Sequence, residues 1–229
     1  MFTGIIEGLG ILRARRELPT PTTGWAAGLE GVLRLEVEPL ASAPGGPVWP
    51  EGTPAAGPWV EGESIAVHGV CLTLVRPPAP GAPLEFDVIP ETLAKTTLGD
   101  MDLGARVHLE RAARASTLMG GHVVQGHVDG VGRVLSITTD RGWRAKISVP
   151  AHLAAYLVPK GSIAVDGVSL TLAEVFPAEQ AFEIALIPTT LAKTTLGALS
   201  PGAPVHIECD PMAKTIVHYL RHFSASGRG

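Results

Sequence analysis

The sequence predicts an all-β protein of two similar small barrels in tandem, followed by a C-terminal α-helix. The first reason is an internal repeat: the eleven residues from Ser64 return from Ser162 with nine identities. The second is a series of short β-branched runs at regular spacing with turn residues between them, which is typical of small barrels. The third is a helix start, Asp210-Pro211, near the end of the chain.

The repeat extends on both sides of this block. Further matching segments at the same offset of 98 are residues 92–99 with 190–197 and 107–110 with 205–208. The beginnings of the two copies, 4–10 and 126–132, are instead 122 residues apart. The first copy therefore holds 24 extra residues. We expect most of them in 39–58, a surface loop rich in Pro, Gly and Ala without a function of its own, with Trp49 and Trp59 as anchors.

Each copy contains a predicted β-hairpin. His68-Gly69 stands between the β-branched runs 65–67 and 70–75, and Asp166-Gly167 stands at the equivalent place in the second copy. A two-residue turn that ends in Gly between such runs is a hairpin signal. Further strands are expected over 33–37, 84–88, 106–109, 146–149, 182–186 and 205–207.

Two helices are predicted outside the strands. The first covers 111–119 and ends at Gly120-Gly121, because Gly is a common helix stop. The second begins at Asp210-Pro211 and places apolar residues at spacings of 4, 3 and 4. These are Met212, Ile216, Tyr219 and Phe223. Such a seam fits either a helix that packs on its own barrel or an oligomer contact.

Composition excludes several classes of function. The chain has 229 residues, enough for one or two domains. Its net charge of −4 is not the positive charge that is typical of proteins that bind nucleic acid or an anionic membrane. It has no run of eighteen apolar residues and begins without a secretory signal, so we expect a cytoplasmic protein. Its two isolated cysteines, Cys71 and Cys209, fit a reducing compartment, and no metal-ligand spacing is present. Cys209 is expected to be a buried small residue.

Small polar side chains recur on one face of a strand in each copy. Side chains alternate along a strand, so Cys71 and Thr73 share a face and Leu72 lies on the other. Ser169 and Thr171 repeat this arrangement. A lone Cys on an apolar strand is more often a buried small residue than a reactive one. Two copies of one polar pocket nevertheless fit a protein that binds two like molecules.

The copies differ at polar positions of these predicted pockets. The differing pairs are Cys71 and Ser169, His127 and Ile5, Glu91 and Thr189, and His68 and Asp166. Two copies with the same role need not differ there, whereas donor and acceptor roles would require it. His127 also fits a structural histidine. No spacing indicates a Ser or Cys triad, so hydrolase chemistry is unsupported.

Several spaced motifs resemble the riboflavin synthase family, in the right order along the chain. They are 1–8 (MFTGIIEG), 69–73 (GVCLT), 120–128 (GGHVVQGHV), 166–171 (DGVSLT) and the two TTLG blocks that begin at Thr96 and Thr194. The resemblance runs from Met1 to about Phe223, apart from the insertion. The chain departs from the family pattern in its longer first copy and in Thr189, where Glu is common.

The resemblance implies an all-β chain with two tandem six-stranded Greek-key-like barrels and a C-terminal helix. The implied domains are an N-terminal lumazine-binding barrel over 1–120, a C-terminal lumazine-binding barrel over 121–209, and a trimerisation helix with a tail over 210–229. In the implied homotrimer, each active site lies between the N-terminal barrel of one subunit and the C-terminal barrel of a neighbour. Lumazine synthase is a candidate partner.

The implied reaction needs no cofactor and no metal. One 6,7-dimethyl-8-ribityllumazine gives a four-carbon unit to a second, and the products are riboflavin and 5-amino-6-(D-ribitylamino)uracil, in the last step of riboflavin biosynthesis. Both substrates already hold the atoms and electrons that the products need. An oriented site assists such a reaction by roughly 7–11 kcal/mol. A nearby acid or base must also take a proton from the 7-methyl group and help to stabilise the anion.

The resemblance also assigns site residues. Those implied in catalysis are Cys71, His127, Ser64, Thr171 and Asp210, with Cys71 first, as nucleophile or proton-transfer group. The implied ring-binding positions of the first barrel are Gly4, Ile5, Ile6, Cys71, Leu72, Thr73, Asp87, Val88, Ile89, Pro90, Glu91 and Thr92. Those of the second barrel are Gly126, His127, Val128, Lys160, Ser169, Leu170, Thr171, Ala185, Leu186, Ile187, Pro188, Thr189 and Thr190.

Two other functions stay open. A non-catalytic lumazine- or flavin-binding protein would share the double barrel, but such binding-only relatives typically lack the residue at Cys71. A flavin-binding reductase domain would need a nucleotide domain. No Rossmann segment is present, since no helix follows Gly4, Gly8 and Gly10.

Overall fold

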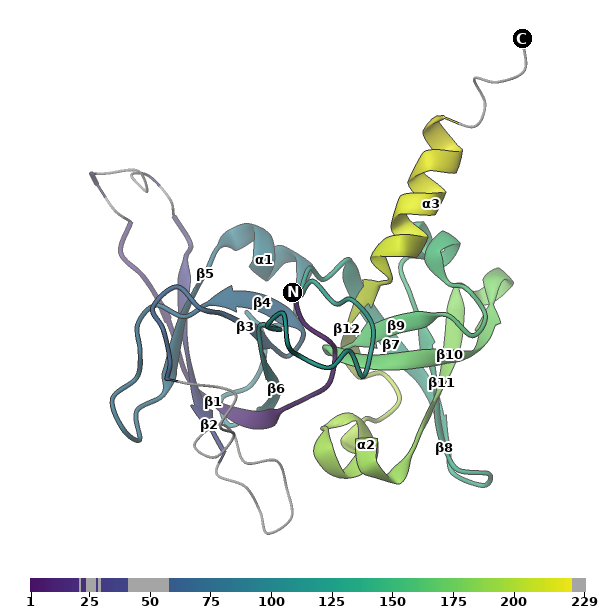
Figure 1. Ribbon diagram of the computed structural model, residues 1–229, viewed down its shortest axis with the longest axis horizontal. Helices are drawn as coiled ribbons and strands as arrows, with labels where there is room; N and C mark the ends of the chain where they lie inside the picture. The colour runs from purple at the N-terminus through teal and green to yellow at the C-terminus, as the bar shows by residue number, and fades with distance from the viewer. Residues whose placement is uncertain (21, 24–27, 29, 41–57, 224–229) are drawn as a thin grey trace.

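The computed structural model describes residues 1–20, 22, 23, 28, 30–40 and 58–223. Two six-stranded sheets lie side by side, and one long helix leaves the second of them (Figure 1). The predicted all-β class with a C-terminal helix is confirmed. Most of the predicted insertion at 39–58, Trp49 included, lies outside the described residues.

The first sheet is built from the first copy of the repeat. Its strands are β1 (Gly8–Glu17), β2 (Leu33–Pro39), β3 (Ser64–Val67), β4 (Val70–Thr73), β5 (Leu84–Val88) and β6 (Arg106–Arg111). Their order in the sheet is β4-β3-β6-β1-β2-β5. The neighbours β2·β5 and β3·β6 are not consecutive in the chain, as in a Greek key. An isolated bridge between Leu74 and Phe86 joins the two ends of this sheet.

The second sheet is a closed barrel with the same topology. Its strands are β7 (Gly130–Thr138), β8 (Trp143–Ser148), β9 (Ser162–Val165), β10 (Val168–Phe176), β11 (Ala181–Leu186) and β12 (Pro204–Cys209). Here β10 continues to Phe176 and pairs with β11. In the first sheet β4 stops early, because Pro77 and Pro78 follow it and Pro cannot donate a ladder hydrogen bond. Closure of the first barrel is therefore reduced to the single bridge.

Both predicted hairpins are present. β3 pairs with β4 and β9 pairs with β10 in register across two-residue turns. His68 and Gly69 have φ of 50° and 83°, and Asp166 and Gly167 have 49° and 83°. Positive φ at both turn positions is the backbone of a type I′ turn, whose twist matches the flanking strands.

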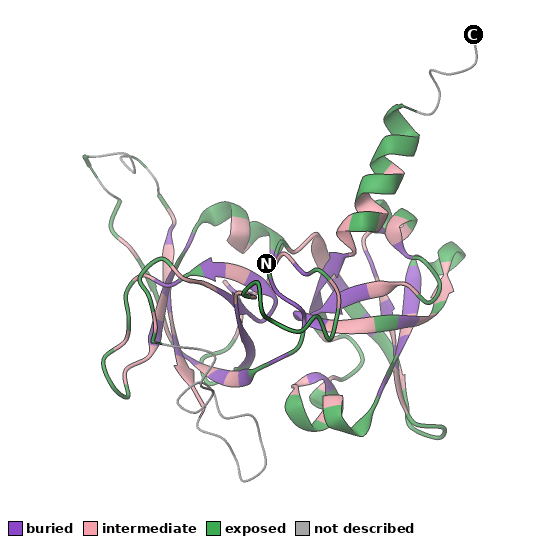
Figure 2. Cartoon of the chain, in the orientation of Figure 1, coloured by how far each residue is buried: buried purple, intermediate pink, exposed green. Residues whose placement is uncertain are grey.

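The strand alternation places polar side chains outside the first barrel. Leu72 and Leu74 are buried in its hydrophobic core, whereas Cys71 is partly exposed and Thr73 is exposed. The predicted polar face is therefore confirmed, and it lies on the outer surface of the barrel. Each barrel has its own core, while most of the C-terminal helix is exposed (Figure 2).

The predicted helix over 111–119 is wrong. Arg111 is the last residue of β6, and the structure shows no helix over 112–119. Pairing with Ile65 of β3 holds Arg111 in the extended conformation. Leu118 and Met119 lie exposed, so a helix here would bury no apolar face, and short helices depend on such burial.

The C-terminal helix α3 (Pro211–His222) begins as predicted. The Asp210 carboxylate accepts a hydrogen bond from the Met212 amide at 2.8 Å. An ion pair between Lys214 and Asp129 of the second barrel fixes the foot of α3, with Nζ–Oδ distances of 3.0 and 2.9 Å. All four residues of the predicted seam are exposed, from Met212 to Phe223. Packing of this seam on the helix's own barrel, one of the two alternatives, is therefore not observed.

Five short helices were not predicted. They are α1 (Pro90–Lys95), α2 (Pro188–Lys193), and the 3₁₀ helices η1 (Ala151–Tyr156), η2 (Pro177–Glu179) and η3 (Leu196–Ala198). α1 and α2 are equivalent in the repeat, and each starts with Pro, whose fixed φ suits a first helical position. α1 directly follows β5 and α2 directly follows β11, and α1 residues lie beside Cys71 in one cavity.

The two copies are related by a two-fold pseudosymmetry at their contact. Equivalent residues meet each other there: Phe2 pairs with Val124, with N–O distances of 2.7 and 3.0 Å. Both side chains are buried together with Ala66 and Ala164, another equivalent pair. The turn glycine Gly69 likewise lies against its equivalent in the second copy. Because each N-terminal segment crosses this contact, the barrels share backbone hydrogen bonds.

Two buried histidines bind the barrels reciprocally. His206 Nε2 accepts the Thr97 N–H at 2.9 Å, so the ring proton is on Nδ1, which donates to the His68 carbonyl at 2.8 Å. His108 makes the equivalent bonds to Thr195 and Asp166, both at 2.8 Å. Burial, and then the nearby His68, lower the pKa of His108 to about 4, so this imidazole is neutral. Each TTLG block is thus held by the histidine of the other barrel.

Substitution of the turn glycine tests the contact between barrels. A Cβ at Gly69 would lie within 2.9 Å of three backbone atoms of the opposite turn, whereas one at Gly104 would have no neighbour within 4 Å. Both residues have positive φ. We expect G104A to cost about 1–2 kcal/mol of unfolding free energy from backbone strain alone. G69A should cost at least about 2 kcal/mol more, measured by urea denaturation. Equal costs would contradict the close approach of the turns.

Candidate functional site

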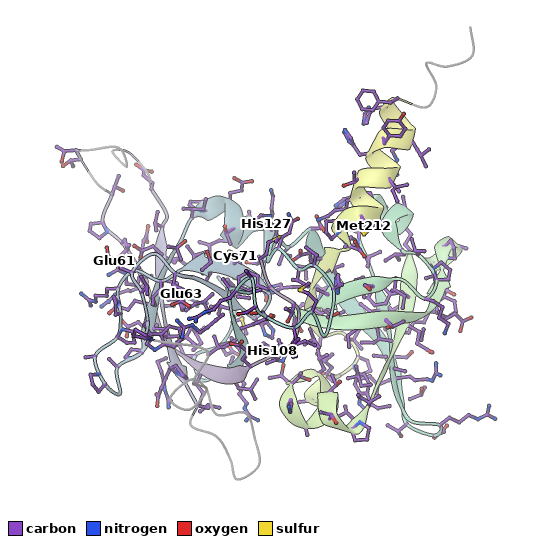
Figure 3. The ribbon with its side chains drawn as sticks, viewed as in Figure 1. Glu61, Glu63, Cys71, His108, His127 and Met212 are labelled. Atoms are coloured by element: carbon purple, nitrogen blue, oxygen red, sulfur yellow. The ribbon has the colours of Figure 1, made fainter. Side chains whose placement is uncertain are left out.

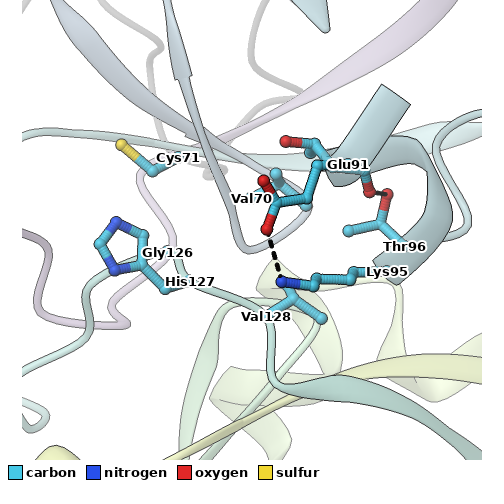
Figure 4. A pocket seen from close by; sticks show the side chains of 9 residues that line it. Val70, Cys71, Glu91, Lys95, Thr96, Gly126, His127 and Val128 are labelled. Carbon is cyan, nitrogen blue, oxygen red and sulfur yellow. Dashed lines mark hydrogen bonds and ion pairs between the residues drawn. The ribbon is translucent and has the colours of Figure 1, made fainter. Parts of the chain in front are cut away.

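A cavity of about 220 Å³ lies beside Cys71, between the first barrel and the start of the second copy (Figure 4). Its lining comes from β4, from α1 and from the strip 126–128. The lining residues are Val70, Cys71, Glu91, Thr92, Lys95, Thr96, Gly126, His127 and Val128. Both repeats therefore contribute to one site, which we call the Cys71 cleft.

Cys71 is fixed to the strip by its own backbone. The Cys71 N–H donates to the Gly126 carbonyl at 2.8 Å. A Cβ at Gly126 would lie 2.6 Å from the Cys71 Cβ, and φ of Gly126 is +76°, so only Gly fits here. The next residue, His127, carries its imidazole to the same side of the cavity as the Cys71 thiol (Figures 3 and 4).

The mouth of the Cys71 cleft carries an ion pair on α1. Glu91 and Lys95 are one helical turn apart, with Nζ 2.8 Å from Oε1. The hydrogen bond from Lys95 lowers the pKa of Glu91, so this exposed carboxylate is charged. The Thr96 hydroxyl donates to the Thr92 carbonyl at 2.8 Å, which secures the end of α1. The cleft thus combines a thiol, an imidazole and a charged pair.

The equivalent of Cys71 in the second barrel is Ser169, and we call its surroundings the Ser169 site. The Ser169 N–H donates to the Gly4 carbonyl at 2.8 Å, and a Cβ at Gly4 would lie 2.6 Å from the Ser169 Cβ. The backbone arrangement therefore repeats that of Cys71 and Gly126. The side chains do not: Ile5 and Thr189 stand where the Cys71 cleft has an imidazole and a carboxylate.

His122 is a neighbour of Ser169 that the sequence analysis missed. Its Nδ1 lies 2.7 Å from the Ser169 hydroxyl oxygen. Burial lowers the pKa of His122, and Asp210 opposes this shift. His122 belongs to the recognised GGHVVQGHV block, but the matched segments 4–10 and 126–132 do not include it. The repeat comparison therefore did not single it out.

Two carboxylates that hold the N-terminal strips of the two copies, residues 3–6 and 125–128, were also missed. Glu208 accepts from three successive backbone amides, 125–127, and Glu110 accepts from those of Thr3 and Gly4. The repeated VH(L/I)E block at the end of each copy was a signal for them. Strand pattern alone gives no reason for a buried Glu, because its partners lie more than 80 residues away in the chain.

The grouping of the site residues by barrel needs correction. The sequence analysis kept Gly4–Ile6 with the first barrel and Gly126–Val128 with the second. In the structure each strip contacts the other barrel. The strip after Phe2 reaches Ser169 of the second barrel, and the strip after Val124 reaches Cys71 of the first. The physical reason is the bridge between Phe2 and Val124, which sends each strip over the contact before its own β1 or β7 begins.

Several other candidate residues lie away from the Cys71 cleft. Ser64 pairs with Thr73 across the β3–β4 hairpin, Thr171 pairs with Ser162 across the β9–β10 hairpin, and Asp210 caps α3. The lining of the Cys71 cavity includes none of these side chains. Lys160 donates to the Ala173 carbonyl at 3.1 Å, also in the second barrel.

Other ring-binding candidates divide by burial. Ile6, Leu72, Val88 and Leu186 have buried side chains in a barrel core. Asp87 forms an ion pair with Arg34, Oδ1–Nε 2.6 Å. Ile89 and Ile187 are exposed apolar residues just before α1 and α2. Neither of these two isoleucines is among the residues that line the Cys71 cavity.

The described part of the chain holds no group of three or more His, Cys, Asp or Glu side chains arranged for a metal ion. None of its helices has the length and apolar character needed to cross a membrane.

Comparison with known proteins gives the family. The family model described as "Lumazine binding domain" matches residues 3–112 and 125–210, one match for each copy. Riboflavin synthase of Mycobacterium bovis is 40% identical over 225 residues, which cover 96% of this chain and 98% of that protein. The chain belongs to the riboflavin synthase family. Riboflavin synthase of Escherichia coli is 41% identical over 168 residues, 72% of this chain and 76% of that protein.

Solved structures agree on the fold. The crystal structure of LumP complexed with riboflavin has a TM-score of 0.70 at 24% identity, and covers 91% of this chain and 99% of that one. LumP complexed with 6,7-dimethyl-8-(1'-D-ribityl) lumazine gives 0.68 at 23% identity, with the same coverage. At this identity the likeness concerns the double-barrel architecture. The resemblance to riboflavin synthases is thus confirmed in both sequence family and fold.

Thiol reactivity tests the different surroundings of the two cysteines. Cys71 is partly exposed at its cleft, whereas Cys209 is 1% exposed and burial raises the pKa of its thiol to about 12. We expect iodoacetamide to label Cys71 in the folded protein and to leave Cys209 unlabelled, because the thiolate is the nucleophile. Peptide mass spectrometry gives the site. Labelling of Cys209 at a rate similar to that of Cys71 would contradict this assignment.

Proposed function

We propose that this chain catalyses the dismutation of two 6,7-dimethyl-8-ribityllumazine molecules to riboflavin and 5-amino-6-(D-ribitylamino)uracil. The observation that carries the proposal is the pair of equivalent positions, the Cys71 cleft and the Ser169 site. They share one backbone arrangement and differ at the reactive positions: Cys71 against Ser169, His127 against Ile5, and Glu91 against Thr189. A reaction of two identical molecules in unlike roles calls for this combination.

The chemistry proposed for the Cys71 cleft is proton transfer and stabilisation of an anion. The 7-methyl group of one lumazine loses a proton, and the resulting carbanion attacks the second molecule. Two new C–C bonds join a four-carbon unit of the donor to the acceptor, and the two C–N bonds that held this unit to the donor break. The donor nitrogens take up protons and leave as 5-amino-6-(D-ribitylamino)uracil, so no external oxidant or reductant enters the balance. Cys71 and His127 are the acid–base groups at hand, and such groups typically contribute 10²–10⁴-fold to a rate. Glu91 and Lys95 offer polar contacts at the cleft mouth.

Each complete site is proposed to form between two subunits of a homotrimer. The lining of the Cys71 cavity includes neither Ser169 nor Gly4–Ile6, so ligands at the two positions of one chain would lie apart. Transfer needs the two rings face to face, which a second chain would achieve by bringing its Ser169 site to this Cys71 cleft. The exposed seam of α3, anchored by Lys214 and Asp129, is the surface proposed to join the copies.

The same proposal covers site residues, surroundings and partners. Ser64, Thr171 and Asp210 are kept as catalytic candidates for the site completed by a neighbour, because none of them lines the Cys71 cavity of its own chain. Two free thiols fit a reducing compartment, which supports the proposal that the protein is cytoplasmic. Lumazine synthase is the partner protein proposed.

Turnover with the lumazine alone tests the proposal. Purified protein mixed with 6,7-dimethyl-8-ribityllumazine should form riboflavin, followed by its absorbance, without added nucleotide or metal. We expect C71S to lower kcat by about 100-fold or more while the ligand Kd stays within about threefold. C209A, which changes the thiol that is not in the cleft, is the matched control and should keep the wild-type rate.

Two outcomes would count against this function. Tight binding of the lumazine by the wild-type protein without any riboflavin would indicate a non-catalytic binding protein. Wild-type turnover by C71S would remove the thiol from the reaction.

A further inference from the structure

We propose that Glu208 is a positioning residue for the Cys71 cleft, which it serves from the opposite barrel. Glu208 lies on β12 of the second barrel and is only 3% exposed. Its carboxylate accepts from three successive amides, those of Gln125 at 2.6 Å, Gly126 at 2.9 Å and His127 at 3.1 Å. The strip that carries His127 is therefore anchored by a single side chain.

The bonding requires a charged carboxylate. Three neighbouring N–H groups that converge on one side form a cradle for an anion. Burial raises the pKa of Glu208, and the amide bonds from the strip act against that rise. A neutral side chain would leave at least one of these buried N–H groups without an acceptor. All three amides therefore have an acceptor, and together they stabilise the carboxylate, only when Glu208 is ionised.

Gly126 transmits this anchoring to Cys71. Its N–H donates to Glu208, and its carbonyl accepts the Cys71 N–H at 2.8 Å. His127 follows directly in the chain and lines the same cavity as Cys71. Movement of the strip away from Glu208 would therefore change the position of the imidazole relative to the thiol.

Glu110 provides a matched comparison within the same chain. It is the equivalent of Glu208, equally buried at 3% exposure, and accepts from the Thr3 and Gly4 amides at 2.6 and 3.0 Å. It lies in the same barrel as Cys71: Ala66 pairs with Cys71 on one side and with Glu110 on the other. The strip that Glu110 holds nevertheless serves Ser169. A general loss of barrel stability would thus affect Cys71 more through Glu110 than through Glu208.

The test compares E208Q with E110Q in the full-length protein. The readout is the rate of Cys71 alkylation by iodoacetamide between pH 6 and 9, which is independent of any turnover. We expect E208Q to change this pH–rate profile about fivefold or more, in the direction that H127A changes it, and E110Q to stay within about twofold of the wild type. In the H127A background, the effect of E208Q should be clearly smaller than in the wild type, since most of it acts through the position of His127.

Turnover gives a second readout, which rests on the proposed function. E208Q should lower kcat by about tenfold or more with KM within about twofold of the wild type. Equal effects of E208Q and E110Q on Cys71 alkylation, or additive effects of E208Q and H127A, would overturn the inference whether or not riboflavin forms. If E208Q does not fold, E208D and E110D replace the pair. Both keep the charge and shorten the reach, and the same difference between them is expected.

Discussion

The exchange of N-terminal strips between the two barrels is the constraint on which the rest of the structure depends. Phe2 and Val124 pair at the pseudosymmetry axis, and each strip then gives a glycine carbonyl to the opposite barrel, Gly126 to Cys71 and Gly4 to Ser169. No room exists for a side chain at either glycine. Separation of the barrels would therefore dismantle both the Cys71 cleft and the Ser169 site, so the repeat works as one unit and not as two independent binding modules.

Buried polar groups make this exchange specific. A buried carboxylate or imidazole destabilises the fold unless its hydrogen bonds are satisfied. Here Glu110 and Glu208 meet the amides of the strips, while His108 and His206 meet a TTLG amide on one nitrogen and a turn carbonyl on the other. Burial raises the pKa of Glu110 to about 7 and lowers that of His108 to about 4, and the hydrogen bonds of the crossed arrangement satisfy both side chains.

Much of the fold could be predicted from the sequence, because hairpins and strands depend on local signals. The turns at His68 and Asp166 and the face shared by Cys71 and Thr73 follow from residue type and alternation. The strip exchange does not, since its hydrogen bonds join residues more than 50 positions apart and leave no periodic pattern. For the same reason the sequence placed Gly126–Val128 in the wrong cleft and missed Glu208 and His122. The false helix at 111–119 arose because a Gly stop signal was read without an apolar face to support the helix.

The Cys71 cleft and the Ser169 site share one backbone arrangement and differ in their side chains. The central claim is that both copies of the repeat contribute residues to the reactive Cys71 cleft. The most direct measurement is a crystal structure of the protein bound to riboflavin. The account predicts that the isoalloxazine ring lies in the Cys71 cleft, in contact with β4 and α1 of the first barrel and with His127 of the crossed strip. A ring held in the interior of a barrel, or in contact with residues of the first copy alone, would contradict it.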